Sequence, residues 1–589
     1  MRLTVHLERR GAAALRALAD EVCEPGSARY GRYLDRAALS ERTCPSADER
    51  EALSAHLMGR GLSPEHPDSL RDAWPGDRAL IFSTDRARLV DALGEPAARE
   101  LLTTRRLSPE HARDVLPRAL AGAVRGLELG PSGHEEPRDL APHDVTPIAS
   151  PASGVAPETI RLGYRFPARG DGHGETIAVM ALGGIPRAQD LDGFWRAHGI
   201  ASPEVRLVTV GPLGPRAHEP LDRFETTMNV QWIGALAPGA RIVVYLLDPG
   251  ATVDPWSAFL GAVLADARHA PTIAVTTWST PERQYRRAHG SATFARLLDE
   301  AAVLGITVIA ASGDWGAHGG FPSVRTDDGA ICDPLERHAT FPGVEARVLS
   351  VGGTQVRALD PWREVAWSAP VSAAIAGAVG MKVLAGGGGF SDTVPIPAWQ
   401  RAVLRSHHPR SHGAPSVAPH GRAQPDVSLM AWGPDFAGRP SSYRALVDGT
   451  WRDDAGGTSV AAPIWAAIVA RLNEARRRED GPRLGCIAPL LYRIAREEPD
   501  ALRAIHEGAT DLELPGLDAD GRRTWFRLPG FLAGEGWSPA TGLGVPDVTA
   551  LERAVSKKRT KKRRERCEPT STSASTPAAR MPPARTTPS

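Results

Sequence analysis

Short runs of apolar and β-branched residues alternate with helical patterns between residues 158 and 555. The runs ETIAVMAL, RIVVYLLD, TIAVTTWS and ITVIAAS have the continuous hydrophobicity of strands that are buried on both faces. Amphipathic segments such as DPWSAFLGAVLADARHA and SATFARLLDEAAVLG lie between these runs. This alternation predicts an α/β domain in which a parallel sheet carries helices on both of its faces.

The first part of the chain, residues 1–130, has a different pattern and predicts a small α+β domain. Its opening run RLTVHL is typical of a strand. The segment SADEREALSAHLMGRGL predicts a helix that begins with a capping box formed by Ser46 and Glu49. A second helix is predicted for residues 108–124, with Pro109 in its first turn.

Two further segments show no hydrophobic periodicity. Residues 131–157 are rich in Pro, Ser, Gly and acidic residues, which predicts an exposed linker that a protease can cut. Residues 556–589 contain the basic run KKRTKKRRER and then a Ser/Thr/Pro-rich stretch, which predicts a disordered tail. The alternative for this tail is binding to an anionic surface or to nucleic acid. Since the formal net charge of the whole chain is only +1, nucleic acid is not an expected partner.

The five cysteines are scattered, without a CxxC pair or the spacing of metal ligands. Such a set argues against a disulfide framework and predicts buried or incidental thiols. The start MRLTVHLERR has no apolar core of a signal peptide, and no apolar run approaches the length of a membrane span. We therefore expect no membrane span, and the location of the protein stays open.

The strongest chemical signal is the segment AGGTSVAAPIWAAIVARLN, residues 455–473. Two glycines precede Ser459, which is expected at the entrance of a long helix with Pro463 in its opening turn. A hydroxyl there lies near the positive end of the helix dipole and beside free backbone N–H groups. This position suits a nucleophile whose attack generates an oxyanion. An ordinary helix-capping serine is the alternative interpretation.

A candidate base lies in the segment ETTMNVQWIGALAPGA, where Glu225 and Asn229 are four residues apart and share one face of a helix. Nucleophile motifs of the GTSxAxP type also occur in subtilisin-like proteases, which need a His base and an Asp. The only partial candidate for that base is His173, and no DTG or DSG sequence is present. A Ser/His/Asp triad is therefore the weaker interpretation.

These motifs resemble those of the sedolisins, the serine-carboxyl peptidases, which include the kumamolisins. GGTSVAAPIWAAI resembles the nucleophile motif, ETTMNVQWIGALAPGA resembles the segment of the base, and ASGDWGA resembles the segment of an oxyanion-hole Asp. The resemblance implies that Ser459 is the nucleophile, Glu225 the base and Asp314 the oxyanion partner. It also implies a subtilisin-like sheet and an endopeptidase that acts on peptide or protein substrates through an acyl-enzyme at acidic pH.

Residues 1–130 resemble the activation prodomain of this family, of the pro-kumamolisin type. The resemblance implies that the chain is made as a zymogen in which the prodomain, removed by cutting the linker, is an intramolecular inhibitor of the peptidase domain at residues 158–555. It further implies a monomer that acts outside the cell, although no signal peptide is visible in the sequence.

Three positions depart from the family pattern, and the first is Asn229, which stands where the family has Asp. An amide can orient Glu225 but cannot hold or relay a proton, and the loss of a like charge is expected to lower the pKa of Glu225. We expect weaker activity with a shifted pH profile; the alternative is a protease-fold peptide-binding protein without turnover. Trp278 and Ser279 match a family segment that pairs with substrate, where Ser279 replaces a Gly and adds a Cβ.

The calcium site that is typical of the family is the third departure. At its positions this chain has Ala504 and Ser538, so both carboxylates are absent, and we expect neither a calcium site nor another cofactor. The fold of this region is expected to persist without the ion. An acidic loop is an alternative source of ligands, although a solvated loop is the preferred interpretation: Asp511, Glu513, Asp518 and Asp520.

Overall fold

The structure is a computed structural model. It describes residues 1–64, 79–104, 106–107, 109–130, 138–139, 154–211, 219–248, 252, 254–319, 337, 339–371, 382–404, 418–434, 440–517 and 523–556. The predicted linker lies largely outside the described residues, and the predicted tail lies outside them except for its first residue.

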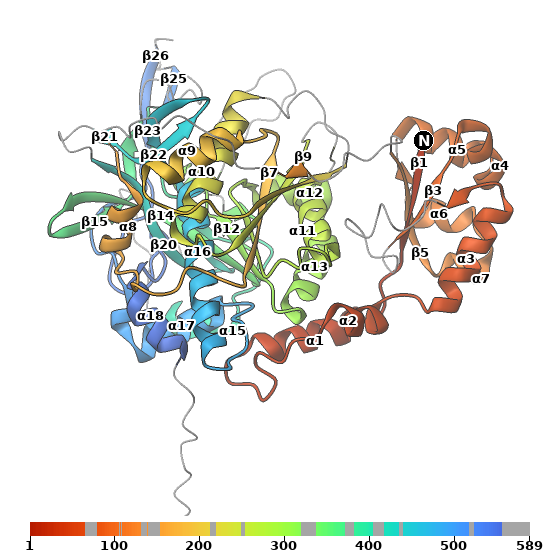
Figure 1. The fold of residues 1–589 in the computed structure, drawn as a ribbon, viewed down its shortest axis with the longest axis horizontal. Helices are drawn as coiled ribbons and strands as arrows, with labels where there is room; N and C mark the ends of the chain where they lie inside the picture. Colours follow the sequence, from red (N-terminus) through yellow and green to blue (C-terminus); the bar gives the residue numbers. More distant parts are fainter. Residues whose placement is uncertain are drawn as a thin grey trace, which may run out of the picture. The chain divides into compact units, whose positions relative to one another are not determined.

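A large, mainly parallel sheet forms the centre of the molecule (Figure 1). Its order is β21-β20-β14-β12-β10-β7-β9-β8-β6, and the neighbours from β20 to β8 run parallel. The parallel strands are β7 (Thr176–Leu182), β8 (Val205–Val210), β9 (Arg241–Leu247), β10 (Ile273–Thr276), β12 (Thr307–Ala311), β14 (Val348–Leu359) and β20 (Val427–Pro434). Antiparallel additions are β6 (Arg138–Asp139), β15 (Trp362–Ala366) and β21 (Pro440–Ser441).

Helices cover both faces of this sheet, as the sequence predicts. Strand β7 illustrates the division, because Ile177 and Val179 belong to one hydrophobic core while Ala178 and Met180 belong to the other. The first core contains residues of α10 (Pro220–Leu236) and α16 (Thr458–Arg478), and the second those of α11 (Pro255–Ala265) and α13 (Ala292–Val303). The strands read as continuous apolar runs because each is buried on both sides.

Other elements surround this layer. The helices are α8 (Pro157–Gly163), α9 (Ala188–Ala197), α12 (Glu282–His289), α15 (Ala398–Leu404), α17 (Ala488–Glu497) and α18 (Val548–Ser556). A four-stranded sheet has the order β16-β17-β25-β26 and contains β16 (Ser368–Pro370), β17 (Val383–Ala385), β25 (Leu512–Leu517) and β26 (Arg523–Leu528). Among the described residues, no helix combines the length and the apolar character that a membrane crossing needs.

The N-terminal domain has its own antiparallel sheet and its own core. The sheet order is β2-β3-β1-β5-β4, where β1 (Arg2–Leu7) is the predicted first strand. Helix α3 (Ala47–Gly59) carries the predicted capping box, with the Ser46 N–H donating to Glu49 Oε2 at 2.8 Å. The other elements are β2 (Ser63–Pro64), β3 (Ala79–Ser83), α4 (Arg86–Leu93), α5 (Glu95–Thr104), β4 (Arg106–Leu107), α6 (Pro109–Asp114), α7 (Arg118–Ala121) and β5 (Val124–Gly130).

The single helix predicted for residues 108–124 is wrong. The segment forms the two short helices α6 and α7, and the strand β5 begins at Val124. Pro117 lies between the two helices and has no backbone N–H with which to continue the first one.

Residues 11–44, here called the arm, leave the core of the N-terminal domain. The arm contains α1 (Ala12–Cys23) and α2 (Arg36–Thr43), and five of its buried side chains belong to the same core as those of α11 and α13. These side chains are Leu15, Ala19, Val22, Cys23 and Leu39. Beside the arm, Arg9 forms a buried ion pair with Glu300 of α13 at 2.9 Å. The two domains are therefore joined by apolar packing as well as by charge pairs.

Candidate active site

Ser459 is the second residue of α16, and it is half-buried. The helix is capped by Gly457, whose φ is 85°, and no side chain caps it. The alternative that Ser459 is a helix-capping serine is therefore wrong. Pro463 lies inside the helix, so it offers no N–H to the carbonyl of Ser459. The hydroxyl stands at the positive end of a 21-residue helix, beside backbone N–H groups of the first turn.

Glu225 of α10 is brought to Ser459, as the resemblance implies. Its carboxylate accepts hydrogen bonds from the hydroxyls of Ser459 and Thr277 and a long one, of 3.5 Å, from Nδ2 of Asn229. Burial raises the pKa of Glu225, and the charge of Asp314 acts in the same direction. The hydrogen bonds oppose this shift without cancelling it, so the pKa of Glu225 is raised overall. The sequence argument considered only the missing charge at Asn229 and left out the burial of Glu225, which has the largest effect on this pKa.

Asn229 is fully buried behind this carboxylate. Its Nδ2 donates to Oγ1 of Thr277 at 3.1 Å, while its Oδ1 is buried without a hydrogen-bond partner among the described residues. An amide oxygen turned toward the carboxylate of Glu225 would repel it, which accounts for the orientation of the amide. Asn229 therefore orients the base and leaves one polar atom unsatisfied.

Thr277 is a member of the site that the sequence analysis missed. It follows strand β10 directly and bridges Asn229 and Glu225 through one hydroxyl. The only signal in the sequence is its position, because polar residues just after buried parallel strands collect at the carboxyl edge of a sheet.

Asp314 lies in the turn after strand β12, near enough to Glu225 for its charge to act on that carboxylate. Its Oδ1 accepts hydrogen bonds from the backbone N–H of Thr458 at 2.9 Å and from the Thr458 hydroxyl at 2.6 Å. Its Oδ2 faces Gly457, where an added Cβ would lie only 2.3 Å away. Burial raises the pKa of Asp314, and the two bonds from Thr458 act against this shift. Thr458 was not anticipated from the sequence; it fixes one carboxyl oxygen and leaves the other toward the helix entrance.

Trp278 and Ser279 continue the loop that begins with Thr277, and both are half-buried. The carbonyl of Trp278 accepts a hydrogen bond from Nε1 of Trp256 at 3.0 Å. Oγ of Ser279 lies 3.4 Å from the place that a Cβ on Gly313 would occupy, so it borders the turn that carries Asp314. The two residues therefore lie at the edge of the site, and their contact with substrate stays a prediction.

His173 is far from Ser459. Its carbonyl accepts a hydrogen bond from Arg477, near the other end of α16, and its side chain is exposed. Eighteen residues of helix separate Arg477 from Ser459, which corresponds to roughly 27 Å at the rise of an α-helix. A general base must lie within hydrogen-bond reach of the nucleophile. A Ser/His/Asp triad with His173 as its base is therefore excluded.

The region that matches the family calcium site keeps its backbone contacts. The N–H of Gly534 donates to the carbonyl of Ile505 at 3.1 Å, next to Ala504. The Ser538 hydroxyl lies 3.1 Å from the Thr541 hydroxyl and takes part in a turn. The described part of the chain contains no group of three or more His, Cys, Asp or Glu side chains that could hold a metal ion.

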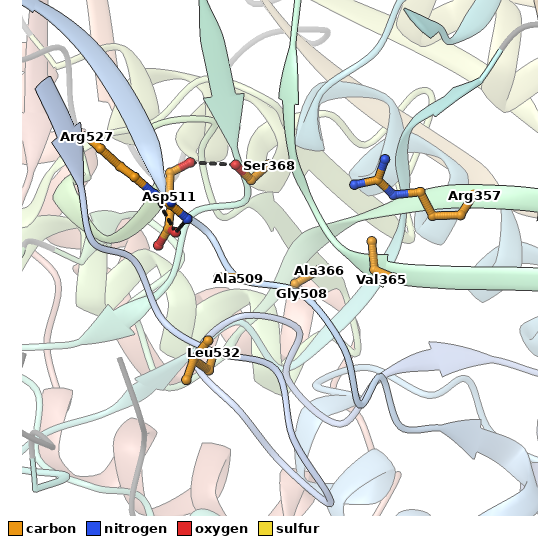
Figure 2. Close-up of a pocket in the computed structure, with 9 residues that line it drawn as sticks. All are labelled: Arg357, Val365, Ala366, Ser368, Gly508, Ala509, Asp511, Arg527 and Leu532. Atoms are coloured by element: carbon orange, nitrogen blue, oxygen red, sulfur yellow. Dashed lines mark hydrogen bonds and ion pairs between the residues drawn. The ribbon is translucent and has the colours of Figure 1, made fainter. Parts of the chain in front are cut away.

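A pocket of about 230 Å³ lies beside Asp511 (Figure 2). Asp511 is already engaged, because it pairs with Arg527, accepts the N–H of Gly530 at 2.7 Å, and its carbonyl accepts the Ser368 hydroxyl at 2.7 Å. It is therefore a poor source of metal ligands, and Asp518 and Asp520 lie outside the described residues. In the described part of the chain, no residue that lines the pocket is hydrogen-bonded to Ser459. The lining residues are Arg357, Val365, Ala366, Ser368, Gly508, Ala509, Asp511, Arg527 and Leu532.

The chain is similar to one family model and to several known peptidases. Residues 1–74 match the family model described as "Pro-kumamolisin, activation domain". The chain is 30% identical over 573 residues to kumamolisin of Bacillus sp. (strain MN-32), covering 94% of this chain and 86% of the relative. It is 27% identical over 578 residues to tripeptidyl-peptidase 1 of Canis lupus familiaris, covering 94% and 91%.

Among solved structures, a Pseudomonas sedolisin, a serine-carboxyl proteinase complexed with two molecules of pseudo-iodotyrostatin, matches with a TM-score of 0.51. The match covers 69% of this chain and 99% of that one at 22% identity. At this identity the likeness establishes the fold, a subtilisin-like parallel sheet with helices on both faces.

Proposed function

Because this chain belongs to the sedolisin family of serine-carboxyl peptidases, we propose that it is an endopeptidase with Ser459 as its nucleophile. The observation that carries the proposal is the convergence of three side chains at the entrance of α16. The Ser459 hydroxyl donates to Glu225, and Oδ2 of Asp314 lies next to Gly457. This arrangement supplies a nucleophile, a base and a hydrogen-bond donor for an oxyanion.

Acylation begins when Oγ of Ser459 attacks the carbonyl carbon of a peptide bond. Glu225 accepts the hydroxyl proton through the hydrogen bond that already joins the two side chains. Thr277 and Asn229 hold the carboxylate in place during this transfer. Glu225 then donates the same proton to the leaving amine, which departs and leaves an acyl-enzyme. A water molecule activated by Glu225 releases the acyl group and restores the Ser459 hydroxyl.

The negative charge of the tetrahedral intermediate requires a donor, and protonated Asp314 fills that role. Thr458 occupies Oδ1 of Asp314, so the proton belongs on Oδ2, which faces the helix entrance. An ionised Asp314 would repel the oxyanion instead. Since burial raises the pKa of Asp314, the protonated form persists to higher pH than in an ordinary aspartate. This requirement favours acidic working conditions, and the absence of a carboxylate at Asn229 predicts reduced activity.

We further propose that residues 1–130 act as an inhibitory prodomain and that cleavage within residues 131–157 releases it. The buried ion pair of Arg9 with Glu300 and the packing of the arm support tight association in the intact chain. Protein or peptide substrates of the mature enzyme are expected to lie along the loop of Trp278 and Ser279.

The test is self-processing of the full-length chain between about pH 3 and pH 7, which spans ordinary carboxyl titration. We expect a cut within residues 131–157, located by the mass of the products, in the wild type and not in Ser459→Ala. Cleavage that persists in Ser459→Ala would be due to a contaminating protease and would contradict the proposal.

A folded wild-type chain that shows no processing at any pH would favour the alternative, a peptide-binding protein with a protease fold. The buried, unpartnered Oδ1 of Asn229 is the observation on which this alternative rests. A peptide aldehyde distinguishes the two, because a reactive serine adds to the aldehyde carbonyl and the adduct raises the thermal unfolding temperature. We expect this increase in the wild type and its loss in Ser459→Ala.

A further inference from the structure

Two cysteines from opposite ends of the chain meet between the arm and the larger domain. Cys23 is the last residue of α1, and Cys486 lies two residues before α17. Each is 5% exposed, and both belong to the core that the arm shares with α11 and α13. Neither forms a disulfide in the structure, and each thiol has the largest effect on the pKa of the other, as expected of neighbouring sulfurs.

Arg347 holds the backbone on both sides of this thiol pair. Its guanidinium binds Asp20 of α1 at 2.8 Å and Asp299 of α13 at 2.7 Å. The thiol of Cys486 donates to the carbonyl of the same arginine at 3.9 Å. Asp20 lies almost one helical turn before Cys23. Arg347 therefore contacts Cys486 directly and the helix that carries Cys23 through Asp20.

Tyr33 fixes a second point a short distance along the arm. Its hydroxyl donates to the carbonyl of Arg483 at 3.1 Å, three residues before Cys486. Its side chain lies between two glycines, since a Cβ on Gly305 would come within 2.4 Å of the ring and a Cβ on Gly485 within 2.4 Å of the hydroxyl. Arg347 and Tyr33 therefore hold the segments that carry Cys23 and Cys486 in a fixed position relative to one another.

We propose that Cys23 and Cys486 form a redox latch, in which a peroxide converts the thiol pair into a disulfide that ties the arm to the larger domain. The latch would keep the N-terminal domain attached after the linker is cut, and this regulatory meaning rests on the proposed function. Formation of the bond itself requires no peptidase activity.

The chemistry uses hydrogen peroxide as a two-electron oxidant. The neighbouring Cys23 thiol lowers the pKa of Cys486, while the neighbouring Cys486 thiol, together with burial, raises the pKa of Cys23. Cys486 is therefore the attacking thiolate. Its sulfur takes one oxygen of the peroxide, the O–O bond breaks, and hydroxide leaves and takes up the proton that Cys486 released, forming water. The Cys23 sulfur then attacks the sulfenic sulfur, and its proton leaves with the S–O oxygen as a second water.

Cys44 provides a matched internal control. It is also a buried, free cysteine of the arm, but its sulfur contacts Arg9 and Thr43 rather than another thiol. Its replacement by serine is therefore expected to leave the latch intact.

The first experiment uses the full-length Ser459→Ala chain, in which self-processing cannot interfere. After treatment with hydrogen peroxide and blocking of free thiols, we expect a cross-linked peptide that joins Cys23 to Cys486. Thiols titrated under denaturing conditions should fall by two from the five in the sequence. Cys44→Ser should still form the cross-link, whereas Cys23→Ser and Cys486→Ser should each lose it. A folded, oxidised chain in which both cysteines stay free would overturn the proposal.

The second experiment measures release of the N-terminal domain from the oxidised and the reduced full-length chain. An added protease cuts within residues 131–157, so the readout does not depend on the activity of the chain itself. Under native conditions we expect release to be slower by about tenfold or more after oxidation, because a disulfide removes the freedom of the cut ends to separate. Dithiothreitol should restore the fast rate, and Cys486→Ser should show it throughout. Equal rates in the oxidised and reduced wild type would overturn the latch.

Discussion

Nδ2 of Asn229 lies 3.1 Å from the hydroxyl oxygen of Thr277, and that hydroxyl is also hydrogen-bonded to Glu225. Two neutral side chains thus stand behind the base where the sedolisin pattern has a second carboxylate. They fix the direction of Glu225 through hydrogen bonds, but neither can accept its proton at the working pH. Glu225 keeps the position that a general base needs, but no second carboxylate stands at Asn229 with which it could share a proton.

Restoring the carboxylate is expected to raise activity and to move its pH dependence. In Asn229→Asp a like charge beside Glu225 raises the pKa of Glu225 further, so the acidic limb of kcat/KM should move to higher pH. The rate at the optimum should rise by about tenfold, within the range of acid–base effects. The measurement is kcat/KM against pH for a peptide substrate, with Asn229→Ala to separate loss of the amide from gain of the carboxylate. Superimposable profiles for wild type and Asn229→Asp would contradict this role.

Thr277→Val removes the bridging hydroxyl while keeping the shape of the side chain. Because the hydrogen bond from Thr277 opposes the burial of Glu225, the pKa of Glu225 should rise and kcat/KM at low pH should fall by about tenfold. Thr276→Val is the matched control, since that hydroxyl contacts Met180 and Trp278 instead. An equal loss of activity in both variants would show that the effect is structural.

Gly457→Ala is expected to disable the oxyanion donor. The new Cβ would lie 2.3 Å from Oδ2 of Asp314, so the carboxyl must move away from the helix entrance. We expect kcat to fall by about a hundredfold, the size of a lost oxyanion donor. Gly449→Ala serves as control, because its φ of 71° imposes a similar backbone strain where nothing lies within 4 Å. If both variants keep full kcat, the close approach of Gly457 does not determine the position of the Asp314 carboxyl group.

The raised pKa of Asp314 also predicts a pH dependence of stability. The folded chain holds this proton at pH values where the unfolded chain has released it, so the contribution to stability is largest at low pH. It is lost as the pH rises from the ordinary aspartate value, about 4, through the folded value. In the Ser459→Ala background, the free energy of unfolding relative to a further Asp314→Asn change should therefore decrease from about pH 4 to pH 7. A constant difference would mean that the pKa of Asp314 is not raised.

The sequence was sufficient to predict the strands β7, β9, β10 and β12 and to name Ser459, Glu225 and Asp314 as candidates, because each lies in a long apolar pattern or a specific motif. It was not sufficient for Thr277 and Thr458, since a threonine after a strand or before a serine carries no distinctive spacing. Nor was the position of the arm readable, because α1 shows the same amphipathic pattern whether it packs on its own domain or on another. The pairing of Cys23 with Cys486 is equally invisible, as it depends on a contact between residues far apart in the chain.

The arm has a consequence for the lifetime of the mature protein. Leu15, Val22 and Leu39 fill part of a core whose remaining walls belong to the other domain. If the proposed cleavage of the linker releases the arm, the chain that remains no longer contains all the side chains with which it folded. Unfolding of the mature protein would then be irreversible. Its half-life would depend on the rate of unfolding rather than on the equilibrium between folded and unfolded states.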